Sequence, residues 1–578
     1  MILHALHDIA TCVAERGLYL DRWIYVINAM IYKKAGVLEL DELRVIHLFE
    51  ADFNMIVGIL FGRRAMYHNV DNNLLHLGQY GCPGGECQDV AFAKILHTHM
   101  ATYSHTSLGQ FESDAASCFD RIVMRFVFAI LAAWGAPTSA LRMWEQTLYH
   151  IVHSVKTALG HSKASYRYSP SSPIIGPGQG SQGGPAACSV ATSPLLTSMD
   201  RLAHGISFTD PSQQLSYSAC AKMFVDDNTN YSNKFLPWLH TPPNPTVVRD
   251  MIQHDAQTWE RLLWTSGGLL KLEKCLYYLM VWTFDSEGIA SLAPSSELPP
   301  MELSSGDSGI TTDITQYDSS CAHRTLGNWV GPNLQMTTAL SKLKDSAHTY
   351  SIRLSSSALS KLDAWISYFA VFLPMMTYTL PVCHHSHKSL DSIQSAPTCS
   401  TLLKLGFNRH TAHAVVYGSV HYAGLGLRSL FIEQGIAMLL ISMRHLRAGT
   451  DVGTLLLITI QWWQLVAGVS FALLDFPAKP LPYLSSDWFT VFRSFLAAIR
   501  GSLHIPAVTN AILSPPRLLD TCLMDRVTSL PSVSSADLMR FNRVRLWMSV
   551  TYLSEISSAD GYLLALDACN GSRIRHTP

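Results

Sequence analysis

Two adjacent carboxylates, Asp226 and Asp227, follow an apolar run in the stretch KMFVDDNTNY at residues 222–231. Like charges side by side repel, and this repulsion raises the pKa of one of the two groups. Asp and Asn also favour turns, so the same stretch is typical of a β-hairpin tip. The pair therefore has two interpretations, a turn without chemistry or a site for divalent cations.

A third carboxylate, Asp114, ends a short strand expected at FESD, just before a helix. Carboxylates at the ends of two adjacent strands can converge on one point. Mg²⁺ prefers carboxylate oxygens and substrate phosphates, and two such ions clamp the attacking and leaving oxygens of an in-line phosphoryl displacement. If Asp114, Asp226 and Asp227 converge, their mutual repulsion itself predicts a cation. Three converging carboxylates would hold Mg²⁺, with Mn²⁺ as an alternative, and could support nucleotidyl transfer, but spacing alone does not establish that they converge.

Strands and helices must position these carboxylates, and the sequence pattern predicts several of them. A helix is expected at 1–17, and a strand that runs into an apolar helix is expected at 109–134. The other expected elements are a strand and turn at 23–36, a strand running into a helix at 41–66, a helix that begins after the Gly/Pro/Ser-rich segment 165–184, a helix at 250–268 and a strand at 269–282.

The second half of the chain has a different character. Residues 286–320 are acidic and rich in Ser and Pro, which predicts a flexible surface insertion. Beyond 324 the pattern is mostly helical. The stretch Leu455 to Leu474 is long enough to span a membrane. Gln461, Gln464 and two Trp lie at its middle, which favours a buried helix of a large domain.

The composition is globular but poor in charge. Of the 578 residues 48% are hydrophobic and 15% charged, with a net charge of -1, whereas about 25% of an average protein is charged. Nucleic-acid binding would therefore need a local basic groove. The 12 Cys form no CxxC pair, and the N-terminus lacks signal-peptide features, which together predict an intracellular protein, nuclear or cytoplasmic, with reduced thiols. The CHHSH segment at 383–387 has no partner cluster with zinc-finger spacing, which favours an exposed His loop.

Five motifs occur in order along the chain: SDAASCFD, GPGQGSQGG, FVDD, GGLLKLEKC and HRTLG. This order resembles that of reverse transcriptases, especially those of retrotransposons without long terminal repeats. In that family an aromatic residue follows the first catalytic Asp by five positions, and another Asp often follows by six, which matches Asp114, Phe119 and Asp120. The second motif is a Gly-Pro-Gln-Gly-Ser-type loop. Here it contains Gln179 and Gly180, and it departs from the family at Gly178, where Pro usually stands.

The remaining motifs extend the resemblance over about residues 20–345. The third, an aromatic residue followed by X-Asp-Asp, corresponds to Phe224 through Asp227. The fourth ends in Lys274 and Cys275, and the fifth is a Leu-Gly turn at 326–327 that grips the primer in the family. The segments around Lys34 and Arg44 resemble the fingers, where basic residues meet the incoming triphosphate.

The resemblance implies an α+β right-hand polymerase fold. It implies fingers and a palm with an antiparallel sheet at 1–285, the acidic insertion at 286–320, a primer-grip turn and helical thumb at 321–400, and a helical C-terminal region of unknown role at 401–578. The implied activity is RNA-directed DNA synthesis for a retroelement, with an RNA template, a DNA primer and deoxynucleoside triphosphates as partners and no membrane. The implied catalytic and metal-binding residues are Asp114, Asp226 and Asp227, and the implied substrate-binding residues are Lys34, Arg44, Phe119, Gln179, Gly180 and Lys274.

Other interpretations stay open. An RNA-dependent RNA polymerase usually has Asp five residues after the first catalytic Asp and reads Gly-Asp-Asp at the third motif, so Phe119 and Val225 argue against it. A decayed or domesticated copy that binds nucleic acid without catalysis would fit Gly178 and the near-neutral charge. Lys34, Arg44 and Lys274 could be surface charges, and Phe119 could simply pack in the core. The GQGSQG run also fits GxGxxG, but flanking prolines exclude a dinucleotide-binding strand-turn-helix there.

Overall fold

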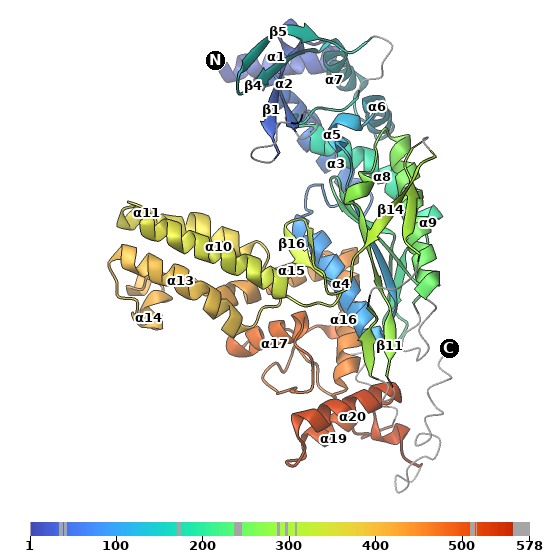
Figure 1. The fold of residues 1–578 in the computed structure, drawn as a ribbon, viewed down its shortest axis with the longest axis vertical. Helices are drawn as coiled ribbons and strands as arrows, with labels where there is room; N and C mark the ends of the chain where they lie inside the picture. The colour runs from blue at the N-terminus through green and yellow to red at the C-terminus, as the bar shows by residue number, and fades with distance from the viewer. Residues whose placement is uncertain are drawn as a thin grey trace.

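The computed structural model of the chain describes residues 2–33, 39, 43–169, 175–235, 245–285, 289–294, 299–306, 309–508, 515 and 517–558. Within these ranges helices are mixed with sheets whose strands pair mostly antiparallel. A small N-terminal sheet lies at one end, a larger sheet occupies the middle, and the C-terminal helices extend from it (Figure 1).

The N-terminal sheet has four strands in the order β2-β1-β4-β5. Its strands are β1 (Tyr25–Tyr32), β2 (Leu43–Leu48), β4 (Val152–Thr157) and β5 (Gly160–Tyr166). Helix α1 (Ile2–Arg16) packs against α7 (Thr138–His150), and α2 (Ala51–Val57) follows β2. The helix expected at 1–17 and the strands expected at 23–36 and after 41 are confirmed.

The central sheet has six strands in the order β13-β14-β10-β3-β9-β8. Its strands are β3 (Leu108–Ser113), β8 (Ala221–Phe224), β9 (Asp227–Asn233), β10 (Leu276–Met280), β13 (Met301–Ser304) and β14 (Thr311–Gln316). Only β10 and β14 pair in parallel among these strands.

Helices cover both faces of the central sheet. Successive side chains of a strand point to opposite faces, so Phe111 of β3 packs with α8 (Gly184–Leu202) and α9 (Pro245–Thr265). Its neighbours Gln110 and Glu112 reach residues of α4 (Cys87–Ser104) on the other face. Helices therefore pack on both faces of the sheet.

Two expectations about this region are wrong. The flexible insertion expected at 286–320 is wrong for 301–304 and 311–316, which form β13 and β14 of the central sheet. Met301, Leu303 and Ile314 are buried between exposed polar residues, an alternation that the acidic composition obscured. The helix expected within 109–134 is broken into α5 (Cys118–Arg121) and α6 (Met124–Ala133), because Val123 forms a bridge with Ile175.

The described part of the chain beyond 330 is mostly helical, as expected. Its helices are α10 (Thr337–Ser356), α11 (Lys361–Ser367), α12 (Leu373–Thr377), α13 (His387–Leu405), α14 (His413–Val416), α15 (Leu430–Ala448), α16 (Asp451–Ala467), α17 (Trp488–Ala498), α19 (Leu523–Thr528) and α20 (Ser535–Trp547). Helices α10, α11, α13 and α14 form an arm that projects away from the central sheet (Figure 1).

Helix α16 is the apolar stretch that raised the question of a membrane span. It is buried and packs against α4, which confirms the buried-helix prediction up to Ala467. Nowhere in the described ranges is a helix long and apolar enough to cross a bilayer. The exposed His loop expected at 383–387 is wrong in part, since His384 and His385 are buried and burial lowers the pKa of each to about 4. The described cysteines are free thiols.

Candidate active site

The Asp pair lies at the tip of the β8–β9 hairpin, as the sequence predicts. Phe224 pairs with Asp227, so Val225 and Asp226 form a two-residue turn. Val225 has a φ of +59°, a left-handed conformation that is strained for a branched side chain. Gln79 holds this turn, because its amide oxygen accepts from the Val225 N–H at 3.0 Å and its Nε2 donates to the Val225 carbonyl at 3.4 Å. The surrounding protein therefore imposes the conformation that presents Asp226.

Strand register places Asp114 beside this hairpin. Ser113 at the end of β3 pairs with Asn228 of β9, so the same register extended by one residue sets Asp114 across from Asp227. Paired Cα atoms of antiparallel strands are about 4.5–5.5 Å apart. The Asp114 carbonyl also accepts from the Lys271 N–H at 2.8 Å, which fixes the chain as it leaves the strand. The structure thus brings all three predicted carboxylates to one end of the central sheet.

The carboxylates influence one another electrostatically. Burial raises the pKa of Asp226 and the Asp114 charge raises it further, whereas Arg44 lowers it. The pKa of Asp227 rises to about 6, because neighbouring chain removes hydration from its carboxylate and because Asp226, Asp114 and Glu112 repel its charge. Carboxylate oxygens that raise each other's pKa are a donor set that suits a hard divalent cation.

The three acids do not form one compact set of ligand atoms. The carboxylate oxygens of the three acids are not all within 4.8 Å of one another. In the described part of the chain, only His204, His254 and Asp255 have ligand atoms that close together. Asp114 instead forms an ion pair with Lys274, with Nζ 3.2 Å from Oδ2.

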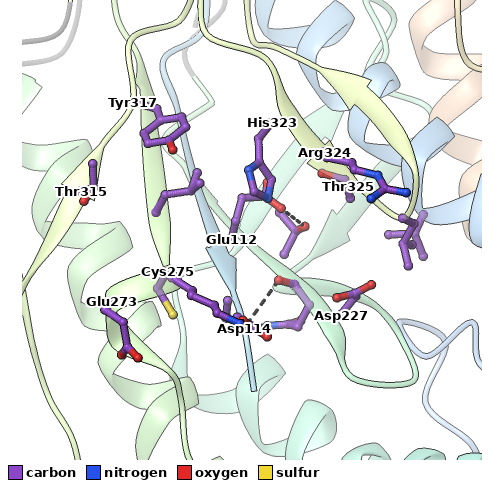
Figure 2. A pocket seen from close by; sticks show the side chains of 17 residues that line it. Glu112, Asp114, Asp227, Glu273, Cys275, Thr315, Tyr317, His323, Arg324 and Thr325 are labelled. Carbon is purple, nitrogen blue, oxygen red and sulfur yellow. Dashed lines mark hydrogen bonds and ion pairs between the residues drawn. The ribbon is translucent and has the colours of Figure 1, made fainter. Parts of the chain in front are cut away.

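A cavity of about 450 Å³ opens over Asp114 and Asp227. Figure 2 shows the side chains around it, which come from β3, β9, the segment before β10, β14 and the hairpin of β15 (His323–Thr325) and β16 (Asn328–Val330). Lys274, Cys275 and Leu326 line it together with Asp114 and Asp227, so four of the five sequence motifs meet at this cavity.

The hairpin at the cavity has a tight two-residue turn. Leu326 and Gly327 both have positive φ, +46° and +84°, as a hairpin turn that follows the twist of its strands requires. The Tyr378 hydroxyl donates to the Leu326 carbonyl at 2.9 Å. This contact holds the predicted Leu-Gly turn against the end of α12.

Glu112 is a cavity residue that the sequence analysis missed. It lies two positions before Asp114, and the two-residue period of a strand could have placed both on one face. Its Oε1 accepts from Lys94 at 2.5 Å and its Oε2 accepts from Thr229 at 2.9 Å. Lys94 is 1% exposed and also donates to the Thr325 hydroxyl at 2.8 Å. One buried ammonium thus joins α4 to β3 and to the β15 hairpin beneath the cavity.

The predicted glycine loop lies outside the 450 Å³ cavity, against β2. A Cβ on Gly180 would lie 2.4 Å from the His47 carbonyl, and Gly180 has a φ of +115°. Gly178 has a φ of +79°, which proline cannot adopt because its ring fixes φ near −65°. Gly178 is therefore required by this backbone, whatever residue the family prefers. The Gln179 carbonyl accepts from the His47 N–H at 2.6 Å. The Gln179 N–H donates to the Asp120 carboxylate.

The other predicted substrate contacts are placed as follows. Arg44 is exposed on β2, and its charge reaches Asp226, whose pKa it lowers. Phe119 is half-buried and does not line the 450 Å³ cavity; a Cβ on Gly184 would lie 3.4 Å from its ring. Lys274 contacts Asp114. Lys34 lies outside the described residues.

Asp227→Asn is expected to stabilise the metal-free protein at neutral pH. The folded chain holds the Asp227 proton more tightly than the unfolded chain, because its pKa is about 6 instead of 3.8. Wild-type stability therefore falls as pH rises between about 4 and 6, and the Asn variant escapes this loss. Urea unfolding midpoints in the presence of a chelator should favour the variant near neutral pH and coincide near pH 4. Equal midpoints at both pH values would show that Asp227 is not repelled.

Comparison with known proteins gives little. No protein-family model matches the chain, and no curated protein matches it. A solved structure of telomerase from Candida albicans, in complex with a TWJ fragment of telomeric RNA, is similar over 77% of this chain at 11% identity and a TM-score of 0.32. The match spans 66% of that chain, just under two thirds of it. This is a weak structural likeness, and the functional argument rests on the site itself.

Proposed function

We propose that the chain is an RNA-directed DNA polymerase of a retroelement with a right-hand arrangement. The N-terminal sheet would serve as fingers, the central sheet as palm and the helical arm from 337 as thumb. The observation that carries this proposal is the juxtaposition of Asp114 with the Asp226–Asp227 turn across paired strands. The motif order of the sequence and the Leu326 turn beside the same cavity support it.

The three carboxylates and two nearby cationic side chains have separate roles in this proposal. Asp114, Asp226 and Asp227 would hold Mg²⁺ or Mn²⁺, and such ions neutralise phosphate charge during nucleotidyl transfer. Arg44, whose charge already reaches Asp226, would attract the triphosphate. Lys274 would exchange the Asp114 carboxylate for a phosphate oxygen. Positioning and charge neutralisation carry most of such catalysis.

Phe119→Ala is expected to raise ribonucleotide incorporation by tens-fold or more. An aromatic ring near the sugar of the incoming nucleotide would clash with a 2′-hydroxyl and offer it no hydrogen-bond partner. Burying that hydroxyl unpaired costs roughly 1–3 kcal/mol, and each 1.36 kcal/mol is about tenfold in rate. Incorporation rates of a deoxynucleotide and the matching ribonucleotide measure the ratio. Phe128→Leu, a core change on α6, is the control. If a folded Phe119→Ala protein has the same ratio of ribonucleotide to deoxynucleotide incorporation as wild type, Phe119 serves only in packing.

A primer-extension experiment separates the three interpretations. The purified chain is given Mg²⁺ with either an RNA or a DNA template and either deoxynucleotides or ribonucleotides. Synthesis of DNA on the RNA template supports the proposal. Synthesis of RNA instead would indicate an RNA-dependent RNA polymerase. Binding of the heteroduplex without extension under any of these conditions would indicate a nucleic-acid-binding protein without catalysis.

A further inference from the structure

Two histidines and an aspartate meet on the α8–α9 side of the central sheet. His204 lies just after α8, and His254 and Asp255 lie on α9. Their ligand atoms all lie within 4.8 Å of one another, and the three form the only group of this kind in the parts of the chain that the structure describes. The Nδ1 atoms of His204 and His254 are 2.9 and 3.1 Å from the same atom, Oδ1 of Asp255.

More nitrogen atoms lie within hydrogen-bonding distance of this oxygen than its lone pairs can serve. Oδ1 of Asp255 also accepts the backbone N–H of His204 at 2.8 Å. A carboxylate oxygen offers about two lone-pair sites, so two ring N–H groups and one backbone N–H would exceed its capacity, whereas a ring nitrogen without a proton would repel it. A cation in place of the two ring protons removes the excess. One lone pair then accepts the backbone N–H, and the other binds the cation together with both ring nitrogens.

The carboxylate is held in place by the surrounding protein. Asp255 is 0% exposed, and its Oδ2 accepts from the Ser232 hydroxyl at 2.6 Å and from the Gly205 N–H at 3.0 Å. Such outer hydrogen bonds orient metal ligands and support their affinity. The His204 and His254 side chains are 45% and 51% exposed. The open side leaves room for water as a further ligand.

The donor atoms of the three side chains indicate which metal ion fits the site. Two imidazole nitrogens and one carboxylate suit Zn²⁺, whereas Mg²⁺ prefers an all-oxygen set. Tetrahedral Zn²⁺ with bonds of about 2.0–2.1 Å needs ligand atoms roughly 3.3–3.4 Å apart. The observed 2.9 and 3.1 Å require only a small outward movement of the two rings. We propose that His204, His254 and Asp255 bind Zn²⁺.

The position of this site indicates a structural role. Ser232, which contacts Asp255, is five residues along β9 from Asp227, a separation of about 16–17 Å at the rise of a strand. Zn²⁺ here would not reach the cavity carboxylates. It would join the end of α8 to α9, and α9 packs on β9. The proposal is independent of the proposed polymerase activity.

Calorimetric titration of the full chain with Zn²⁺ tests the site without any activity assay. Wild type should show a binding step with a stoichiometry of one Zn²⁺ per chain. In each of His204→Ala and His254→Ala this step should be absent, or its affinity should fall by about 100-fold or more. The benchmark is that loss of an outer-shell partner alone costs about 10–100-fold. His421→Ala, an exposed histidine elsewhere, should bind as wild type does, and Mg²⁺ should not compete.

A second measurement distinguishes the proposed site from metal binding by free thiols. Co²⁺ bound by nitrogen and oxygen ligands shows no thiolate charge-transfer absorption, so the wild-type Co²⁺ complex should lack it. Circular dichroism checks that the Ala variants are folded, which is expected because both rings are exposed. If an Ala variant does not fold, His204→Gln or His254→Gln takes its place. Wild-type binding that is absent, or equally tight in both His variants, would overturn the proposal.

Discussion

Asp226→Asn is expected to lower the rate of nucleotide addition by about 1,000-fold or more. Asp226 is presented by a strained turn that Gln79 holds, and its pKa is raised by burial and by Asp114. If Asp226 holds cations as proposed, loss of its charge removes several kcal/mol of transition-state stabilisation, and each 1.36 kcal/mol is about tenfold in rate. Single-turnover extension of a primed RNA template measures the effect.

The same variant should bind the template as tightly as wild type or more tightly, because a negative charge near the phosphates is removed. Asp8→Asn is the matched control, since this carboxylate is exposed on α1 far from the cavity. It should leave extension and binding unchanged. Asp226→Asn activity within a few-fold of wild type would remove Asp226 from the reaction, whereas equal losses of binding and extension would indicate a damaged fold.

Lys94→Met is expected to destabilise the central sheet by about 3–5 kcal/mol. Lys94 and Glu112 are 1% and 7% exposed, and breaking such a pair leaves a charge buried without a partner. Hydrogen exchange measured on peptides from α4 and β3 should show the loss of protection. The exposed pair Arg125–Glu145, at 3.9 Å, supplies the control, because Arg125→Met should cost at most about 1 kcal/mol.

The double variant Lys94→Met, Glu112→Gln separates charge from packing. If the cost of Lys94→Met comes from the unpaired carboxylate, removing that charge should restore much of the protection in β3. A double variant as unstable as Lys94→Met would show that the lysine stem matters through packing alone.

Local patterns predicted the elements that carry the site. The apolar run before Asp226 and the turn-forming residues after it are sufficient to predict the hairpin, and FESD is sufficient to predict the strand that Asp114 follows. The resemblance in motif order then related these two elements to each other, which spacing alone could not do.

Other features depend on contacts that no local pattern contains. Helix α4 is buried on nearly all sides, so nothing in its sequence marks Lys94 as the partner of Glu112. The Lys222–Asp451 ion pair ties β8 to the start of α16 across 229 residues of sequence. The need for Gly178 follows from its φ of +79°, and the strands within 286–320 form because apolar residues alternate there despite the acidic composition.

The central claim is that Asp114, Asp226 and Asp227 catalyse template-directed addition of deoxynucleotides to a primer. Single-nucleotide addition tests it most directly, with four RNA templates that differ only in the first unpaired base and each deoxynucleotide supplied alone with Mg²⁺. Wild type should add only the complementary deoxynucleotide on each template, and the Asp226→Asn protein purified in parallel should add none. Addition that ignores the template base, or addition by wild type that does not exceed that of the Asn variant, would contradict the claim.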